Sequence, residues 1–498
     1  MYLSRKLSTD QYVALTILIL TNLTILWLTA PIWQQQNLND DSFITLTYAK
    51  NLAHGNGFVY NHPPATLGTT TPFFALLTAL LAIILPFLTV VEAGILLSII
   101  AWIGTGWGIY LIMRHLDFKP ISSAVSASIA ILPATIWLHF VGMEIWLFQF
   151  LLVLSVWLSV TQKPFYAGVT IGALYLTRGE GILVGLILVG YFWLNQRKIP
   201  KDFIAGIMVI LAIWFVYAMI TFGTFIPNTL AAKQAQAQID GAGPTFVERI
   251  VLNILPNIVR HKLFFGHQTV NLYFLLIVLG FIHAVYKNKK LLIFPTWAII
   301  YLTAYTILNP KPYFWYILHV VFIFQLLAGI GLGWLFEVAR KNSYISKRVI
   351  INIGAVILTV AFLYPYITSF SQDFSGDDRA TTYKAISTWL NQNSCPEQSV
   401  AYIEIGYLGY FTDNRIIDLA GLIDPTTTQH LVTDGFEWGF WHYQPDYYIY
   451  AEEFDWALGG IKSAINDYTI AHEVPRDGKF STPIYIFQRK RIEACNRS

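Results

Sequence analysis

Two adjacent carboxylates, Asp40 and Asp41, follow the first long apolar stretch of the chain. Aspartate is costly near hydrocarbon, so a pair of aspartates where a helix leaves a bilayer is either solvated at the interface or has a chemical task there. The apolar face formed by Ile44, Tyr48 and Leu52 predicts a helix that starts beside the pair, which makes Asp41 a candidate N-cap. A single cap position accounts for only one carboxylate. Asp40 is therefore either catalytic or simply solvated.

A second group of charges lies further along the chain. Glu144 follows Gly142 at the start of an apolar stretch, where it is either a second catalytic acid or a charge favoured by the helix dipole. Arg178 and Glu180 stand in a very short polar turn between two apolar stretches. Arg178 either binds an anion there or pairs with Glu180 or Glu144.

The composition indicates the scaffold that must hold these groups. Of 498 residues, 55% are hydrophobic and 12% are charged, and the mean hydropathy is +0.52. Globular proteins carry about 25% charged residues, so the sequence predicts an α-helical polytopic protein embedded in a lipid bilayer. The net charge of +3 gives no reason to expect a nucleic-acid partner. The sequence has no CxxC or HExxH spacing, which argues against a structural metal site and leaves a divalent cation cofactor open.

Apolar stretches long enough to cross a bilayer predict about eleven membrane spans. With a cytoplasmic N-terminus, the basic connections NQRK, KNKK and RKNSYISKR all lie on the cytoplasmic side, as the positive-inside bias requires. An odd number of spans then places the C-terminal part outside, for a protein of the cytoplasmic membrane. The apolar segment 73–90 contains Pro86 and is interpreted as an interfacial or re-entrant helix. The expected spans are 12–33, 92–113, 121–138, 145–161, 164–177, 180–195, 203–222, 271–286, 291–308, 315–335 and 348–367.

Two domains are expected. Residues 1–369 form a transmembrane module with a first outer loop at 34–91, and residues 370–498 form a soluble extracytoplasmic domain. Short strands alternate with helical patterns in the second part, which favours a small α/β domain. Cys395 precedes the first of these strands and Cys495 follows the last, and both face an oxidising side, so we expect a disulfide between them.

A series of motifs carries a family resemblance: DDSFITLTYAKNLAHGNGFVYN, TTTPFFALLTALL, VGMEIWLFQFLL, LTRGEG, FIPNTLAAK, PYFWYILHVVF and AYIEIGYLGYFTDNRIIDLAGLIDP. In this order, they resemble the GT-C superfamily of membrane glycosyltransferases. The closest likeness is to its polyprenyl-phosphate-sugar-dependent branch, which includes bacterial arabinofuranosyltransferases and uncharacterised relatives. The chain departs from the family pattern at Gly179 and His319, where proline is common, and this leaves the local geometry open.

The resemblance implies transfer of a sugar from a polyprenyl-phosphate donor to a glycan, lipid or protein acceptor at the outer face of the membrane. It implies that Asp40 is the general base, supported by Asp41, with Glu144 as a second acidic candidate. A single base without a facing nucleophile favours inversion at the anomeric carbon. The leaving phosphate needs cations, for which the candidates are Arg178, Lys233, Arg260, Lys262 and Lys311.

Substrate contacts are expected from polar and aromatic side chains at the outer ends of the spans. Each has an ordinary alternative, because aromatic residues form interface belts, basic side chains snorkel and a histidine often only hydrogen-bonds at the interface. The candidates are His139, Glu180, Asn228, Tyr313, Tyr316 and His319.

Two other functions compete with glycosyl transfer. The protein is alternatively a transporter or flippase of lipid-linked sugars, or a non-catalytic membrane scaffold. A transporter should carry interrupted helices and charges at the membrane midplane. The ionisable residues of this chain instead cluster at the expected outer ends of the spans, which favours an enzyme.

Overall fold

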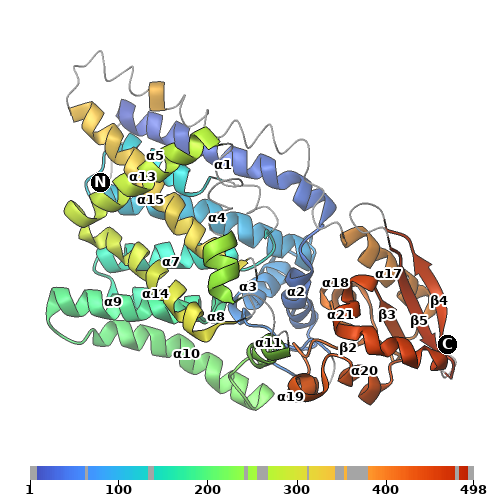
Figure 1. Cartoon of the computed structure of the whole chain (residues 1–498). Helices are drawn as coiled ribbons and strands as arrows, with labels where there is room; N and C mark the ends of the chain where they lie inside the picture. The colour runs from blue at the N-terminus through green and yellow to red at the C-terminus, as the bar shows by residue number, and fades with distance from the viewer. Residues whose placement is uncertain are drawn as a thin grey trace. The chain divides into compact units, whose positions relative to one another are not determined.

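The computed structural model describes most of the chain as two compact units (Figure 1). The described residues are 8–61, 65–132, 140–239, 245–254, 267–310, 313, 315–341, 353–355, 379–476 and 482–491. Unit 1 comprises Met1–Gln34, Ile95–Ile213 and Pro244–Phe374. Unit 2 comprises Gln35–Gly94, Trp214–Gly243 and Ser375–Ser498.

Apolar helices dominate the first two-thirds of the chain. Among the described residues, five helices are long and apolar enough to cross a membrane, and several shorter apolar helices accompany them. The helices up to residue 341 are α1 (Thr9–Gln35), α2 (Asp40–Ala53), α3 (Pro72–Ile84), α4 (Val90–His115), α5 (Pro120–Ala130), α7 (Ile145–Val160), α8 (Pro164–Thr177), α9 (Gly181–Gln196), α10 (Lys201–Phe222), α11 (Asn228–Ile239), η1 (Val247–Ile254), α13 (His267–Tyr286), η3 (Lys289–Leu292), α14 (Ile293–Leu308) and α15 (Trp315–Lys341).

The helix boundaries follow local signals in the sequence. Pro72, Pro120 and Pro164 each stand at the first position of a helix, where proline costs no hydrogen bond and its fixed φ suits the helix. The left-handed residues Arg197 and Asn309 end α9 and α14. These signals explain the helix ends at which they stand, while α5 ends earlier and α15 later than the predicted spans.

The expected spans from 12–33 to 315–335 each overlap an observed helix. The expected span at 121–138 overlaps α5, which ends at Ala130, and residues 133–138 lie outside the described ranges. The expected span at 348–367 lies outside the described residues, apart from 353–355. The segment 73–90 forms α3, which ends at Ile84, before Pro86. Its placement at the membrane interface stays a prediction.

Helix α15 forms the centre of unit 1. Of its most apolar window, 83% is buried, and it packs against both α13 and α5 (Figure 1). Its buried side chains include Val320, Phe322 and Ile323. Buried hydroxyls also join helices of this unit, since Thr21 of α1 donates a hydrogen bond of 2.8 Å to Ser128 of α5.

The C-terminal part of unit 2 is a five-stranded sheet with helices. The strand order is β2-β1-β3-β5-β4; β1 pairs in parallel with β2 and β3, while β5 is antiparallel to β3 and β4. The strands are β1 (Ser399–Tyr402), β2 (Arg415–Asp418), β3 (Tyr447–Tyr450), β4 (Tyr468–Val474) and β5 (Ile484–Arg489). The helices are α17 (Ala380–Asn393), α18 (Gly406–Phe411), α19 (Pro425–Asp434), α20 (Trp438–Tyr443), η4 (Glu452–Phe454), α21 (Asp455–Leu458) and η5 (Gly459–Asp467). The predicted fold class, a helical polytopic membrane protein with a small C-terminal α/β domain, is confirmed.

Two earlier segments of the chain pack with this sheet in unit 2. Helix α2 lies beside α18, and α11 lies beside α19 (Figure 1). The side chain of Asn61 exchanges hydrogen bonds of 2.7 and 3.2 Å with the backbone of Ile416, on edge strand β2. These contacts require that the loops after α1 and α10 lie on the same side of the membrane as the C-terminal part. Which side that is stays a prediction.

Two predictions about the C-terminal part depend on residues outside the described ranges. The expected domain boundary between residues 369 and 370 lies within 356–378, which the structure does not describe. Cys395 is disulfide-bonded, but Cys495 lies beyond the described residues, so their pairing stays a prediction.

Candidate functional site

Asp40 is buried at the start of α2 and is held by the backbone of α18. Only 5% of Asp40 is exposed. Its Oδ2 accepts a hydrogen bond of 3.0 Å from the amide of Gly406, and its Oδ1 accepts one of 2.9 Å from the amide of Tyr407. Each carboxylate oxygen can accept about two hydrogen bonds, so both oxygens keep a free acceptor position after binding these amides. The carboxylate is therefore fixed in orientation and still able to take a proton.

Burial and, to a smaller degree, the charges around Asp40 make it a stronger base than an ordinary aspartate. Burial raises the pKa of Asp40 to about 8, and the negative charges of Glu404 and Asp41 add to the rise, against the amide of Tyr407 and the positive charge of Arg379. Arg379 forms an ion pair with Glu404. A general base works best when its pKa lies near the pH at which it acts. The environment of Asp40 meets that condition.

The expectation that Asp41 caps α2 is wrong. The helix begins at Asp40, two residues earlier than expected, and its N-cap is Asn39, whose backbone is extended and whose side chain accepts the capping hydrogen bond. The Asn39 Oδ1 accepts a hydrogen bond of 3.0 Å from the amide of Asp41. Asparagine and aspartate are about equally good N-caps, so residue preference alone could not place the helix start. The half-buried Asp41 consequently lies in the first turn with its carboxylate free of the cap.

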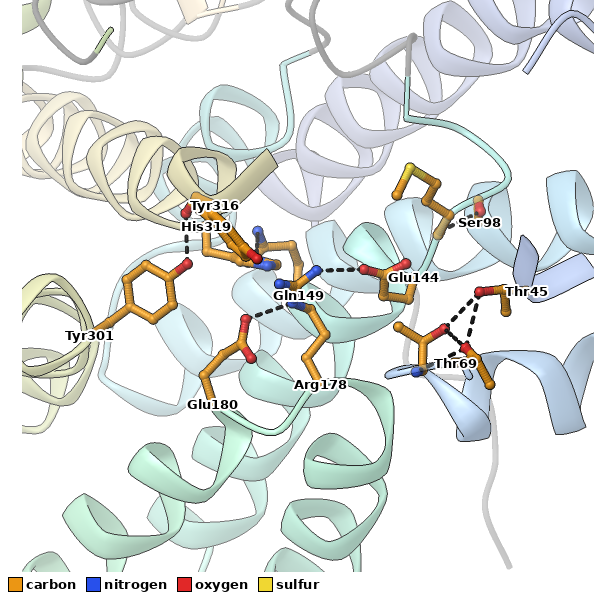
Figure 2. A network of polar contacts seen from close by, with 12 residues as sticks. Thr45, Thr69, Ser98, Glu144, Gln149, Arg178, Glu180, Tyr301, Tyr316 and His319 are labelled. Atoms are coloured by element: carbon orange, nitrogen blue, oxygen red, sulfur yellow. Dashed lines mark hydrogen bonds and ion pairs between the residues drawn. The ribbon is translucent and has the colours of Figure 1, made fainter. Parts of the chain in front are cut away.

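Unit 1 contains a second acidic centre, an ion triad made of Glu144, Arg178 and Glu180 (Figure 2). Arg178 Nη1 lies 2.6 Å from Glu144 Oε1, and Arg178 Nε lies 2.6 Å from Glu180 Oε1. The three side chains are between 4% and 9% exposed. Glu144 stands just before α7, while Arg178 and Glu180 stand in the turn between α8 and α9, so three helix ends meet at this triad.

Aromatic and polar side chains surround this triad. The guanidinium of Arg178 lies over the ring of Tyr316, 5.6 Å from its centroid. The hydroxyl of Tyr301 donates a hydrogen bond of 2.8 Å to the backbone carbonyl of Tyr316. The fully buried His319 is hydrogen-bonded through Nδ1 to the side-chain amide of Gln149 at 3.1 Å, as Figure 2 shows. The alternative that Arg178 pairs with Glu180 or Glu144 is observed, and with both partners at once. Tyr316 and His319 were predicted separately from these charges, and the fold brings them to the same place.

Asn228 is occupied by contacts within unit 2. Its side-chain amide donates to the carbonyl of Gly421 at 2.7 Å and to the hydroxyl of Thr428 at 3.0 Å, and its backbone amide donates to Leu67 at 2.8 Å. Asn228 thus fastens α11 both to the C-terminal sheet domain and to the first segment of the unit. A role in substrate binding stays a prediction.

The remaining predicted residues are only partly placed. Lys233 is half-buried on α11, and Tyr313 stacks on Trp315 with ring centroids 4.5 Å apart. Among the described residues, no group of three or more His, Cys, Asp and Glu side chains could hold a metal ion. Four predicted residues lie outside the described ranges: His139, Arg260, Lys262 and Lys311.

The partners of Asp40 in the C-terminal part were missed from the sequence. Gly406 and Tyr407 belong to the GYLGYF segment, whose sequence indicates a family likeness but no contact with Asp40. A Cβ atom on Gly406 would lie 1.8 Å from the carbonyl oxygen of Asp40, so only glycine fits there. A Cβ on Gly409, one helical turn later, would lie 1.7 Å from the hydroxyl of Tyr60. This spacing of two glycines was the available signal that one face of α18 lies against another segment.

Three threonines near the acidic pair were also missed. The hydroxyls of Thr45, Thr69 and Thr71 lie 3.1 to 3.2 Å from one another (Figure 2). Thr45 follows Asp41 by one turn of α2, while Thr69 and Thr71 precede α3. The TTTP segment was noted only as part of a motif, because nothing in its spacing points to α2.

Solved structures share this architecture along nearly the whole chain. ArnT from Cupriavidus metallidurans, crystallised with undecaprenyl phosphate, superposes with a TM-score of 0.64 at 13% sequence identity, covering 95% of this chain and 97% of ArnT. The oligosaccharyltransferase of Archaeoglobus fulgidus, crystallised with a tethered acceptor peptide, gives a TM-score of 0.55 at 14% identity and covers 95% and 74%. The fold is that of the GT-C superfamily. The resemblance read from the motifs is thereby confirmed at the level of the fold.

Other comparisons limit what the GT-C fold says about this chain. The mycobacterial arabinofuranosyltransferase AftD gives a TM-score of 0.52 at 13% identity and covers 98% of this chain, which spans only 40% of AftD. Residues 372–489 match a domain of unknown function, DUF8728. No curated protein sequence matches the chain. The GT-C fold is thus established by structure, without a sequence family for the whole chain.

Proposed function

We propose that this protein is a membrane glycosyltransferase that takes a sugar from a polyprenyl-phosphate donor. The observation that carries the proposal is the fold match with ArnT over nearly the full length of both chains, since that ArnT structure contains undecaprenyl phosphate. Asp40 supports the proposal independently, because a buried carboxylate with a raised pKa and fixed orientation suits proton abstraction from an alcohol.

Asp40 is the general base in this reaction. The acceptor hydroxyl gives its proton to a free acceptor position on the Asp40 carboxylate, and its oxygen forms a bond to the anomeric carbon of the donor sugar. The bond from that carbon to the phosphate oxygen breaks, and its electron pair leaves with the polyprenyl phosphate. Because the acceptor oxygen attacks the anomeric carbon directly, the displacement inverts the anomeric configuration. Asp41, in the same helical turn, supports the acceptor side.

The leaving phosphate needs positive charge as the bond breaks. Lys233 and Arg178 are the predicted cations that lie within the described residues. Arg178 is already balanced by Glu144 and Glu180, so it can grip a phosphate only when one of these carboxylates moves or takes a proton. Arg178 is thus better suited to holding three helix ends together, and Lys233, with the candidates at 260, 262 and 311, to the phosphate.

The finer assignments belong to the same proposal. The reaction takes place at the outer face of the cytoplasmic membrane, with the N-terminus in the cytoplasm. The donor carries a hexose or a pentose, and the acceptor is a glycan, a lipid or a protein. The basic connections on the side opposite to the acidic pair support this orientation.

Substitution of the base tests the function. The full chain is purified into lipid nanodiscs and given polyprenyl-phosphate sugars extracted from host membranes, and consumption of each sugar is followed by mass spectrometry. Asp40→Asn is expected to lower the transfer rate by about 10²- to 10⁴-fold, because asparagine cannot take the proton. Asp41→Asn is expected to have a smaller effect.

Asp418 offers a matched control in the same unit. It is also buried, and its two oxygens accept hydrogen bonds of 2.9 Å from the amides of Ala420 and Ile423. Asp418→Asn therefore removes a carboxylate in a similar setting, with no part in the reaction. Transfer that survives in Asp40→Asn, or that is lost equally in Asp418→Asn, would contradict the role of Asp40 as base.

A further inference from the structure

The turn after β1 has a special position in the C-terminal sheet. In the order β2-β1-β3, the chain leaves β1 through α18 to β2 on one side and later returns to β3 on the other. The carboxyl end of β1 is therefore the point where the strand order reverses. In open α/β sheets this is the place where ligands and functional groups gather. The residues there are Glu404, Ile405, Gly406 and Tyr407.

In this chain, that turn lies against the start of α2, which carries Asp40. Besides the two amide bonds to Asp40, the hydroxyl of Tyr407 donates a hydrogen bond of 2.7 Å to the carbonyl of Leu38. The hydroxyl of Tyr60 donates one to the carbonyl of Ile405 at 2.5 Å. The turn and the acidic segment are thus joined on both sides of Asp40. A side chain at position 406 would collide with the backbone of Asp40, so the close approach of the turn to α2 depends on the glycine at this position.

Ionisable groups from several elements face Asp40. Glu404 of the turn and Asp41 of α2 are acidic, and Arg379, just before α17, is basic. Burial raises the pKa of the phenols Tyr60 and Tyr383, and the negative charge of Asp40 adds to the rise of both. Arg379 and Tyr383 both hydrogen-bond to the carboxylate of Glu404, which fixes it in place. The charge with the largest effect on the pKa of Asp40 is therefore an ordered part of the C-terminal domain.

We propose that the Glu404–Tyr407 turn, together with Arg379, completes the catalytic centre by positioning the Asp40 carboxylate and setting its affinity for a proton. This inference rests on the proposed function and assigns a task to the C-terminal domain of unknown function. Gly406 and Tyr407 act through their backbone amides, and Glu404 and Arg379 act through their charges. All four are positioning residues, because they act on the acceptor only through Asp40.

The chemical consequence is a base whose strength depends on the C-terminal domain. The negative charge of Glu404 disfavours ionised Asp40 and so strengthens its hold on the acceptor proton, while Arg379 has the opposite effect. After the sugar has been transferred, the proton on Asp40 is released to solvent and the base is restored. Docking of the C-terminal turn onto α2 therefore decides both where the base points and at which pH it works.

The test measures the titration of Asp40 directly. Infrared spectra of the full chain in nanodiscs are recorded across pH 5 to 10, and the protonated-carboxyl band that is missing in Asp40→Asn identifies this residue. Glu404→Gln is expected to lower the midpoint of this band by roughly one pH unit, because it removes a like charge. Arg379→Gln is expected to raise it. The pH profile of sugar transfer should shift in the same directions.

Glu453→Gln is the matched control. Glu453 is another acid of this domain that pairs with an arginine, at 2.7 Å from Arg476. Its substitution breaks a comparable ion pair and is expected to leave the titration of Asp40 unchanged. Equal midpoints in wild type, Glu404→Gln and Arg379→Gln would overturn the inference, as would the absence of any band belonging to Asp40.

The two readouts separate this inference from the proposed function. If the infrared midpoints shift as expected but no polyprenyl-phosphate sugar is consumed, the coupling between the turn and Asp40 holds and the glycosyltransferase assignment fails. If sugar is transferred and neither readout moves in the variants, the function stands and the inference fails. Gly406→Ala adds a steric test, since its Cβ must push the turn away from Asp40 and lower transfer even where the charges are unchanged.

Discussion

The two acidic centres of this protein are built in opposite ways. In unit 1, two buried glutamates share one arginine, and both carboxylates are bound by a cation at 2.6 Å. In unit 2, the buried Asp40 is bound by two neutral amides and faces another carboxylate, Glu404. Both centres are almost fully buried. They differ in how the charge is balanced.

This difference in charge balance suits the triad to a structural role and Asp40 to a role in proton transfer. A buried carboxylate paired with arginine is already bound at its oxygens, so the triad suits the fixing of helix ends. A buried carboxylate without its own cation binds a proton readily, which is what a general base must do. On this basis we propose that the triad is mainly architectural and that Asp40 is the reactive group.

The largest effect on stability is expected from breaking the triad. Arg178→Met leaves Glu144 and Glu180 buried without their cation, which should destabilise the protein by about 3 to 5 kcal/mol. The loss of stability is measured by unfolding the protein in lipid nanodiscs with heat or denaturant. Glu180→Gln, which keeps one ion pair, serves as the control and should cost less. A Met variant as stable as wild type would remove the architectural role.

A clear effect of pH on stability is expected from Asp40, the buried carboxylate that is not paired with an arginine of its own. The pKa of Asp40 is raised to about 8 in the folded protein, above its ordinary value of 3.8, so the folded state holds a proton that the unfolded state has lost between these values. This contribution to stability is fully present below about pH 4 and is lost as the pH rises through 8.

Thermal unfolding at several pH values checks this second prediction. Burial also raises the pKa of Asp418, to about 7, so its contribution has the same sign. Asp40→Asn should therefore reduce the fall in stability between pH 5 and 8, and the double variant with Asp418→Asn should reduce it further. An unchanged pH dependence in the double variant would contradict the difference drawn between the two centres.

The smallest effect is expected at the N-cap of α2. Asn39→Ala removes the hydrogen bond to the amide of Asp41 and should cost about 1 kcal/mol. Asn39→Asp keeps a cap and should cost little. Differential scanning calorimetry compares the unfolding temperatures of both variants directly. If the alanine variant matched wild type, Asn39 would not be the group that sets the start of the helix carrying Asp40.

The sequence alone predicted most of the fold and part of the site. Hydrophobic length fixes where helices can cross a bilayer, and proline fixes where several begin, so most of the apolar helices from α1 to α15 followed from local pattern, whereas α11 and η1 did not. Asp40, Glu144 and Arg178 were found in the same way, because a charge beside an apolar stretch stands out. The predicted start of α2 was two residues too late, since asparagine and aspartate cap equally well.

Only the tertiary structure decided which of these charges belong together. Asp40 and Gly406 are far apart in the chain, and no local periodicity connects them; their contact depends on the close approach of two backbones that a glycine allows. The same holds for Glu144 and Arg178, which meet because three helix ends converge. Residue types showed where charge is buried, but whether a carboxylate is neutralised by arginine or left to bind a proton depends on neighbours that only folding supplies.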